Sequence, residues 1–308
     1  MVNGATRRWN LTTPANPNAV DAATGEVLWH LDTDGSDDVP FMALEPAAQA
    51  AFDTWQAVSF AGIEFRSAGG LNVMPGEVLL GMADTLNSVV WLESPLDATF
   101  DVVARTVVRF NANGEIMEAD IVLNGATFLW SVNLDGTVTT RDGPQDVQSI
   151  LTHEVGHFAG LDHAFRQGGS TMFFTAHPAG ALNGRGLKED DIAGLRFLYP
   201  DGVVTGTGTI SGAVTRGGTG LKGVLVEAFQ NGAFVASAIT EPAGSYKIER
   251  LPPGAYQVRA RRSSCPPAST AATWSCRGPT LSVRASTSYE ENPDQSRRLR
   301  LPRRRSPP

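Results

Sequence analysis

The sequence predicts two parts of different fold class, an α+β domain followed by a small all-β sandwich. Within residues 1–200, strand-like segments and one amphipathic helix precede two further helical segments. After residue 208, short alternating segments are separated by Gly and Pro, as is usual in a β-sandwich. A length of 308 residues is also consistent with two domains.

The expected order begins with a strand at 26–32 and a helix at 46–58, with Pro46 in the first helical turn. The helix is expected to be amphipathic, because apolar residues recur at helical spacing: Ala47, Ala50, Ala51, Trp55 and Val58. Short strands then follow at 63–66, 88–92, 102–110 and 116–123. The dipeptide Asn113-Gly114 predicts a hairpin turn between the last two of these strands.

A helix expected at 144–159 carries the most informative pattern of the chain, H-E-x-x-H-x-x-G-x-x-H. Residues i and i+4 of an α-helix share a face, so His153 and His157 can bind one metal ion at about 2.0–2.1 Å. Gly160 favours the end of this helix, because a left-handed residue is least strained when it is glycine. The chain can then turn back and bring His163 to the same ion.

Glu154 points about 100° away from His153 on the helix wheel, where it can contact a water on the open side of the metal. Three neutral nitrogens and one water make a catalytic zinc site rather than a closed structural one. The alternative is a histidine-rich helix with a structural role. A structural zinc would require a fourth ligand, usually cysteine, and Cys265 and Cys276 lie far along the chain. His30 is expected to be a partly buried structural residue of the first strand.

At these residues the chain resembles the metzincin clan of metallopeptidases, and within it the matrixin-like branch. Further marks are a methionine turn at Ser170–Phe174, a helix at 187–199 with paired aspartates near its start, and the segment Glu118–Asn124 followed by Trp130. The resemblance covers roughly residues 9–200. It implies the α+β zincin fold, with a twisted mixed sheet and an active-site helix.

The resemblance also implies roles for individual residues. His153, His157 and His163 would be the ligands of a catalytic Zn²⁺, and Glu154 would activate a zinc-bound water that attacks the peptide bond. The expected activity is therefore that of a zinc-dependent endopeptidase. The alternative is a surface-binding or adhesion protein with a vestigial metallopeptidase domain.

Other residues would support the site without taking part in the chemistry. Met172 would form a hydrophobic floor beneath the zinc, and Gly160 would be structural. Asp190 and Asp191 would act as anions at the start of the last helix and brace the methionine-turn loop. Structural Ca²⁺ is a further expectation for the loops at 32–38 and 111–115, although ordinary turn chemistry explains these loops equally well.

Two departures from relatives are visible in the sequence. Astacin-like and serralysin-like proteins place a Tyr two residues after the turn methionine, where this chain has Phe174, and matrixins often have Pro there. No cysteine precedes Cys265, so the cysteine-switch propeptide of animal matrixins is absent from this sequence. Any latency must then have another basis.

Substrate is expected to bind along the strand 102–110, with Val107 as a representative residue of an exposed edge that can pair with an extended peptide. Selectivity would come from the loop 173–187, through Phe174 and His177. For His177, an ordinary loop histidine is the alternative interpretation.

Beyond residue 200, a linker at 201–208 leads to a module at 209–262. Its segment 239–258 resembles the carboxypeptidase-regulatory-like, prealbumin-type module, which implies a small prealbumin-like or Ig-like sandwich. The Arg/Pro/Ser-rich tail at 263–308 is expected to be disordered, apart from a candidate last strand at 281–284.

The composition of the sequence limits which binding partners and which cellular location the protein is expected to have. A net charge of −7 gives no hint of nucleic-acid binding, and no apolar run approaches the length of a membrane span. The expected partners are protein or peptide substrates of a monomeric protein. The N-terminus lacks the apolar core of a signal peptide, whereas the resemblance implies secretion to the extracellular space. We therefore expect the sequence to begin downstream of the natural start.

Overall fold

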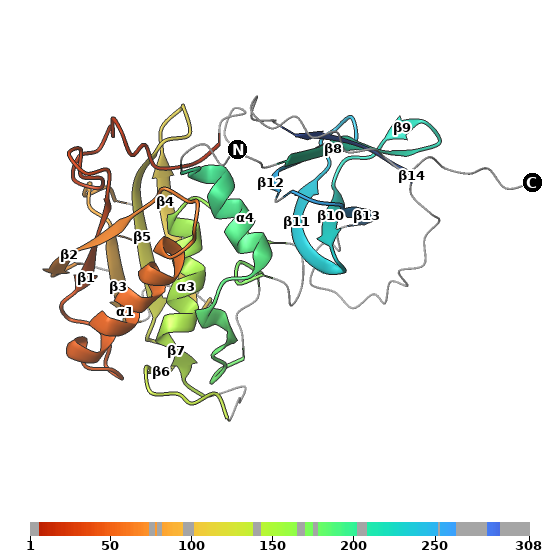
Figure 1. The fold of residues 1–308 in the computed structure, drawn as a ribbon. Coiled ribbons are helices and arrows are strands. Elements are labelled where there is room, and N and C mark those ends of the chain that lie inside the picture. Colours follow the sequence, from red (N-terminus) through yellow and green to blue (C-terminus); the bar gives the residue numbers. More distant parts are fainter. Residues whose placement is uncertain are drawn as a thin grey trace, which may run out of the picture.

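The structure of the protein is a computed structural model that shows two adjoining parts (Figure 1). It describes residues 6–73, 78, 82–94, 102–137, 143–164, 170–174, 178–201, 208–251, 253–262 and 282–289. Among these residues, no helix is both long enough and apolar enough to cross a membrane.

A five-stranded mixed sheet forms the centre of the N-terminal domain, as the sequence predicted. Its strand order is β2-β1-β3-β5-β4, and all neighbours are parallel except β4 and β5. The bounds are β1 Val27–Asp32, β2 Phe65–Leu71, β3 Ser88–Leu92, β4 Ala104–Phe110 and β5 Ile116–Asn124. Consequently, β4 is the antiparallel edge strand of this sheet, at the position expected for the strand that borders a substrate cleft.

The β4–β5 hairpin turns where the Asn-Gly pair predicted it. The side chain of Asn111 accepts hydrogen bonds from the backbone of Asn113 and Glu115, at 2.9 and 3.1 Å. Gly114 adopts φ 81°, a left-handed conformation that glycine takes without strain.

Helix α1, Phe41–Gln56, begins earlier than the predicted start at residue 46. Pro46 therefore lies inside the helix rather than in its first turn, which corrects that expectation. Two features explain the earlier start. Pro40 enters the helix with φ −58°, and Leu44 in the first turns is fully buried in the core.

Helix α3, Val147–Phe158, carries His153 and His157 and is capped at its N-terminus by Asp146, whose side chain accepts a hydrogen bond from Ser149 N at 2.9 Å. The preceding residues 145–146 form the short strand β7, Gln145–Asp146, which pairs with β6, Trp130–Ser131. This pairing explains why α3 begins later than the predicted residue 144. Helices α1 and α3 lie together over one face of the sheet (Figure 1).

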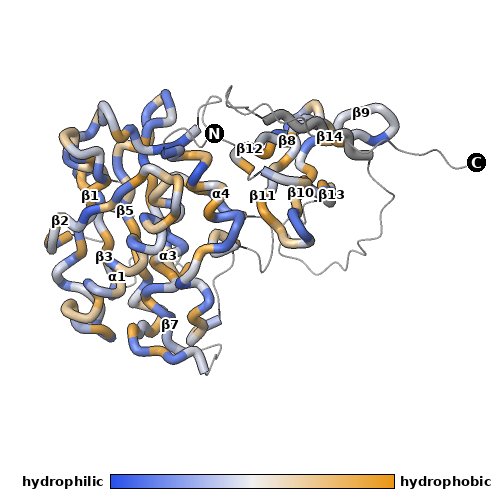
Figure 2. The backbone as a smooth tube through the Cα atoms, viewed as in Figure 1, coloured by the Kyte–Doolittle hydropathy of each residue, from blue (hydrophilic) through white to orange (hydrophobic). Residues whose placement is uncertain are grey.

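Aromatic side chains fill the space between the sheet and these helices. Trp29 stacks on Phe52 with centroids 4.4 Å apart, and Phe52 meets Phe158 edge to face at 5.4 Å. Trp55 is fully buried, and its indole N–H donates to the carbonyl of Thr152 at 2.7 Å. In Figure 2, hydrophobic and hydrophilic residues alternate along the elements, as expected where one face of each element lies in the core. The helix that carries the histidines is therefore rigidly held.

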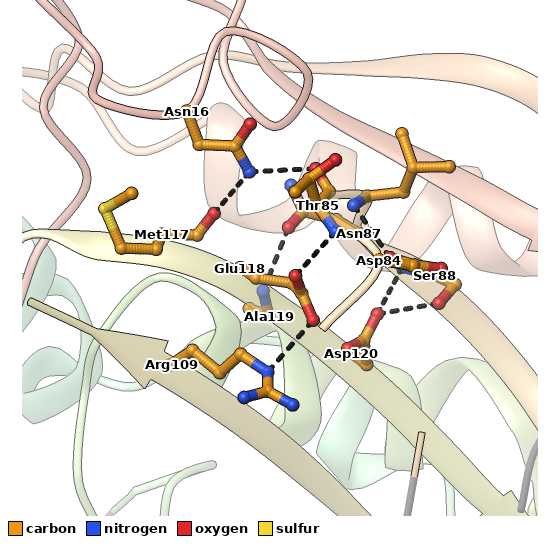
Figure 3. A network of polar contacts seen from close by, with 11 residues as sticks. Asn16, Asp84, Thr85, Asn87, Ser88, Arg109, Met117, Glu118, Ala119 and Asp120 are labelled. Atoms are coloured by element: carbon orange, nitrogen blue, oxygen red, sulfur yellow. Dashed lines mark hydrogen bonds and ion pairs between the residues drawn. The ribbon is translucent and has the colours of Figure 1, made fainter. Parts of the chain in front are cut away.

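A buried polar network joins β3 to β5 on the sheet (Figure 3). Asp120 accepts hydrogen bonds from the backbone N and the hydroxyl of Ser88, at 2.9 and 2.7 Å. Glu118 accepts one from Thr85 N and pairs with Arg109 at 3.1 Å. Burial, with the nearby Glu118 and Asp84 acting in the same direction, raises the pKa of Asp120 to about 7.

Helix α4, Glu189–Leu198, closes the domain after a 3₁₀ turn at Asn183–Arg185. Tyr199 at its end is buried, and its hydroxyl donates to the carbonyl of Ala159 at 2.7 Å while accepting from Trp9 N at 2.9 Å. The Trp9 indole donates to the carbonyl of Phe158 at 2.8 Å. Residues from both ends of the domain thus satisfy the last carbonyl groups of α3.

The C-terminal module is all-β, as predicted, and consists of two sheets with a small core of their own. One sheet has the order β11-β10-β13; the other has β12-β8-β14, with β9 paired to β8. The bounds are β8 Gly208–Arg216, β9 Thr219–Gly220, β10 Val224–Gln230, β11 Ala233–Ile239, β12 Ser245–Leu251, β13 Gln257–Arg262 and β14 Ser282–Tyr289.

Strand β14 extends this module beyond the expected boundary at residue 262. It pairs antiparallel with β8 along its whole length, from Ser282↔Thr215 to Tyr289↔Gly208. The candidate last strand at 281–284 is therefore part of a longer strand. Disorder was expected here because the whole tail is rich in Arg, Pro and Ser, although Val283, Ala285, Thr287 and Tyr289 recur at the two-residue spacing of a strand.

Candidate metal centre and cleft

Three histidine side chains converge at the C-terminal half of α3. One ring nitrogen from each of His153, His157 and His163 lies within 4.8 Å of the others. The Nε2 atoms of His157 and His163 are only 3.1 Å apart. Among the described residues, this is the one group of three or more His, Cys, Asp or Glu side chains that could hold a metal ion.

Backbone carbonyls orient two of these rings. His153 Nδ1 lies 2.7 Å from the carbonyl of Thr171, and His157 Nδ1 lies 2.9 Å from that of Leu161. A carbonyl can only accept, so each Nδ1 carries the proton and each Nε2 keeps a free lone pair. Burial also lowers the pKa of all three histidines, which favours the neutral rings that bind metal. The donor set therefore fits a zinc ion.

The turn at Gly160 brings the third histidine back toward the helix. Gly160 has φ 99°, and its N–H donates to the carbonyl of His157, while Leu161 N donates to that of Gly156. A Cβ at Gly160 would lie 2.7 Å from the carbonyl oxygen of Arg7, so no larger residue fits here. His163 follows in an exposed loop that pairs with the methionine turn through Ala164 N and the carbonyl of Met172, at 2.7 Å.

Met172 lies directly against α3 at Gly156. It is 2% exposed, and a Cβ added to Gly156 would collide with its sulfur and with the ring of Trp55. The absence of a side chain at Gly156 thus lets the methionine approach the helix backbone. Sequence reasoning did not identify Gly156, because the motif leaves that position open.

Asp191 holds the methionine turn in place. Its carboxylate accepts hydrogen bonds from the backbone N of Thr171, Met172 and Lys188, at 2.7, 3.0 and 2.8 Å, and from the hydroxyl of Ser170. Its partner in sequence, Asp190, accepts a hydrogen bond from Ser237 of the C-terminal module at 3.1 Å. The paired aspartates therefore face different neighbours.

Glu154 is buried beside the edge strand of the sheet. Thr106 of β4 places its hydroxyl 2.5 Å from Glu154 Oε2 and 3.1 Å from the Glu154 carbonyl oxygen. Burial raises the pKa of Glu154 above that of an ordinary carboxyl group, while His153 and Thr106 oppose the rise. Sequence analysis missed Thr106, because the contact spans 48 residues and depends on the register of the sheet.

A cavity of about 620 Å³ opens between β4 and the histidines. Ala104, Arg105, Thr106 and Val108 of β4 line it on one side. Glu154, His157 and the segment Gly160–His163 line it on the other. Val107, the expected substrate-binding residue, lies in the same strand, opposite Asp120 of β5.

The loop expected to form a selectivity pocket is described in part. Phe174 is 41% exposed and packs on Phe173 with ring centroids 4.5 Å apart. His177 lies outside the described residues. Arg185, farther along this loop, pairs with both carboxylate oxygens of Asp146 at 2.6 and 2.8 Å. The loop is thereby tied to the start of α3.

The loops considered for calcium use their polar groups on local partners. Asp32 accepts hydrogen bonds from the backbone of Asp34 and Val73, and Asn111 stabilises the β4–β5 turn. A structural calcium ion remains a prediction. His30 is half-buried on β1, with Nδ1 3.3 Å from the carbonyl of Asn87.

Comparison with protein families agrees with both parts of this architecture. The family model described as Matrixin matches residues 22–200, and that described as Carboxypeptidase regulatory-like domain matches residues 209–286. The second match includes most of β14. No curated protein matches the chain.

Proposed function

The chain belongs to the matrixin family, and on this premise we propose that it is a zinc-dependent endopeptidase that hydrolyses peptide bonds of protein substrates. The observation that carries the proposal is the orientation of His153 and His157. Both Nδ1–H groups are bonded to backbone carbonyls, and both Nε2 atoms face the region around His163. A histidine-rich helix with a purely structural role has no need of this arrangement.

In this proposal, His153, His157 and His163 hold the zinc ion, and Glu154 is the catalytic base. Zinc, when bound, polarises the scissile carbonyl and lowers the pKa of water toward about 7. Glu154 accepts the proton of the attacking water and passes it to the leaving nitrogen, so the peptide bond breaks without a charged amide leaving group.

Supporting residues act on the position of these groups. Met172 packs under α3, and Asp191 binds the backbone of the methionine turn, whose Thr171 carbonyl orients His153. Thr106 holds the Glu154 carboxylate near β4. An extended peptide would lie along β4, in the cavity lined by both Thr106 and Glu154.

The second candidate, an adhesion protein with a vestigial domain, finds less support. Loss of catalysis usually leaves a missing base or ligand, whereas Glu154 and the three histidines are all present. The three histidines lie together, and Glu154, His157 and His163 line one cavity. We also propose extracellular action and a monomeric state, in keeping with the matrixin family. The division into a peptidase domain, a linker and a C-terminal module is part of the same proposal.

Replacement of the base tests the proposal most directly. Glu154→Gln keeps the size of the side chain but cannot accept a proton, so turnover of casein should fall by about 10²–10⁴ while zinc stays bound. Glu45→Gln, on the exposed side of α1, is the matched control and should leave turnover unchanged. Zinc content and casein hydrolysis are measured on the same preparations. Near-normal hydrolysis by Glu154→Gln would exclude the assigned role.

A further inference from the structure

The C-terminal module packs directly against the peptidase domain through helix α4. Strands β11 and β12 face this helix, and Ser237 of β11 donates a hydrogen bond to Asp190 (Figure 1). Ala193 of α4 also packs against the hydrophobic cluster of the module. The module is therefore a neighbour of the candidate metal centre, since α4 is the helix that carries Asp191.

A second cavity, of about 360 Å³, lies between the two parts. The segment Leu161–Ala164 and helix α4 form one wall. Residues 236–239 of β11 and 247–249 of β12 form the other. Two large apolar side chains are left exposed in it, Phe197 from α4 at 46% and Ile239 from β11 at 37%.

This second cavity continues from the cleft beside β4. Leu161, Asp162 and His163 line both cavities, so the third histidine stands where they meet. A polypeptide bound along β4 and passing His163 would enter the space between α4 and the module. Strand β11 is the edge strand of its described sheet, so it can offer backbone groups to an extended chain.

We propose that the C-terminal module forms one wall of the substrate cleft and binds an extended segment of the substrate, remote from the cleaved bond, between Phe197 and Ile239. The inference rests on the proposed peptidase function and deepens it. The segment would carry apolar side chains, because the two exposed residues, one from each wall, offer apolar surface. Such binding favours long, unfolded polypeptides over short peptides.

The test compares substrates of increasing length on the zinc-loaded full-length protein. A short peptide is taken from a casein site that the protein cleaves, and it is lengthened stepwise, first on one side of the cleaved bond and then on the other. Binding energy from a remote segment should raise kcat/KM only for peptides long enough to reach the second cavity. The side on which lengthening helps then gives the direction in which the substrate runs.

Two variants remove the apolar surface of opposite walls, Phe197→Ser and Ile239→Ser. Each should lower kcat/KM for casein and for the long peptides by about tenfold and leave the short peptide unaffected. Both residues are exposed, so these changes should leave folding intact. Leu129→Ser is the matched control, because Leu129 is 57% exposed and lines neither cavity.

Several outcomes would overturn the inference. Equal losses on short and long peptides would mean that the variants act on the metal centre instead. No loss on any peptide would mean that the second cavity does not bind substrate. A changed oligomeric state in light scattering, without a changed length dependence, would assign the cavity to a second copy of the chain. If the unaltered protein cleaves no peptide of any length, the proposed function itself fails, and the inference fails with it.

Discussion

Thr106 illustrates how a single hydroxyl group can influence the position of the carboxylate proposed as the catalytic base. Its side chain bridges the edge strand and α3, with Glu154 Oε2 at 2.5 Å. The Thr106 hydroxyl has one proton, so it donates either to Glu154 Oε2 or to the backbone carbonyl oxygen of Glu154, which lies 3.1 Å away. We infer that this bond limits the rotamers available to Glu154.

Removing the hydroxyl should therefore cost activity without loss of zinc. Thr106→Val keeps the β-branched shape but cannot donate, and we expect kcat to fall by about tenfold with little change in KM. Thr106→Ser keeps the hydroxyl, so this variant should retain most of the activity of the unaltered protein. Steady-state kinetics on both variants check this. Equal activity of the Val and Ser variants would show that the hydroxyl has no positioning role.

The histidines give a second prediction at the same scale. His153→Ala or His157→Ala leaves an incomplete donor set, so zinc affinity should fall by more than about 100-fold. His30→Ala, which removes a histidine outside the cluster, should keep one zinc ion per chain. Metal analysis after dialysis against a weak chelator provides the measurement. Stoichiometric zinc in both ligand variants would refute the metal assignment.

Among the elements, strand β5 contains a group whose protonation is linked to stability. The pKa of Asp120 is raised to about 7 in the folded protein, whereas an unfolded Asp titrates at about 3.9. The folded state therefore binds a proton more tightly than the unfolded state does. The contribution to stability is fully present below about pH 4, declines as pH rises, and is lost above about pH 7.

Asp120→Asn should make the free energy of unfolding less dependent on pH. The amide keeps an oxygen to accept the hydrogen bonds from Ser88 but does not ionise. We expect the free energy of unfolding of the unaltered protein to decline more steeply than that of the variant between about pH 4 and about pH 7. Urea unfolding at several pH values in this range measures the difference, with Asp53→Asn on the exposed side of α1 as the control. Parallel pH profiles would contradict the prediction.

Elements with strong local signals were predicted well from the sequence. Strand β3 agrees with its predicted range, and the β4–β5 hairpin turns at Asn113-Gly114, because a short run of β-branched and apolar residues and turn chemistry are both local signals. The start of α1 was wrong by five residues, because Pro46 was taken as the first helical turn although Leu44 continues the buried face of Ala48, Ala51 and Trp55. A proline in the first turns of a helix therefore does not fix where the helix begins.

In the candidate site, too, local sequence signals predict some features, whereas contacts between distant parts of the chain determine others. The spacing of the motif predicts that His153 and His157 share a helix face, since four residues make about one turn. The Thr106–Glu154 and Ser237–Asp190 contacts span 48 and 47 residues, and neither follows from any spacing rule. They depend on the register of one sheet and on the docking of one module. The candidate metal ligands could therefore be predicted from the sequence, but the residues that surround them could not.

At the scale of the whole molecule, the cleft is assembled from separate regions that should affect binding differently. Val107→Pro removes a backbone N–H from β4 and disturbs the edge strand, so it should weaken the binding of all peptides by a similar factor. Changes at Phe174 or His177 should instead re-rank peptides by the residue after the cleaved bond. Cleavage profiling of a peptide library with both kinds of variant separates these effects. Re-ranking by the strand variant alone would reverse the assignment of edge and pocket.

The contact of Trp9 and Tyr199 with the end of α3 has a consequence for synthesis of the chain. The ribosome adds residues from the N-terminus, and the two partners of this contact are 190 residues apart. Until Tyr199 has left the ribosome, the carbonyl of Ala159 lacks the hydroxyl that satisfies it, and the turn that presents His163 is unsupported on that side. If the chain is the peptidase proposed above, its site is completed only after nearly the whole domain has been made, so the growing chain and its neighbours would not meet an active site during synthesis.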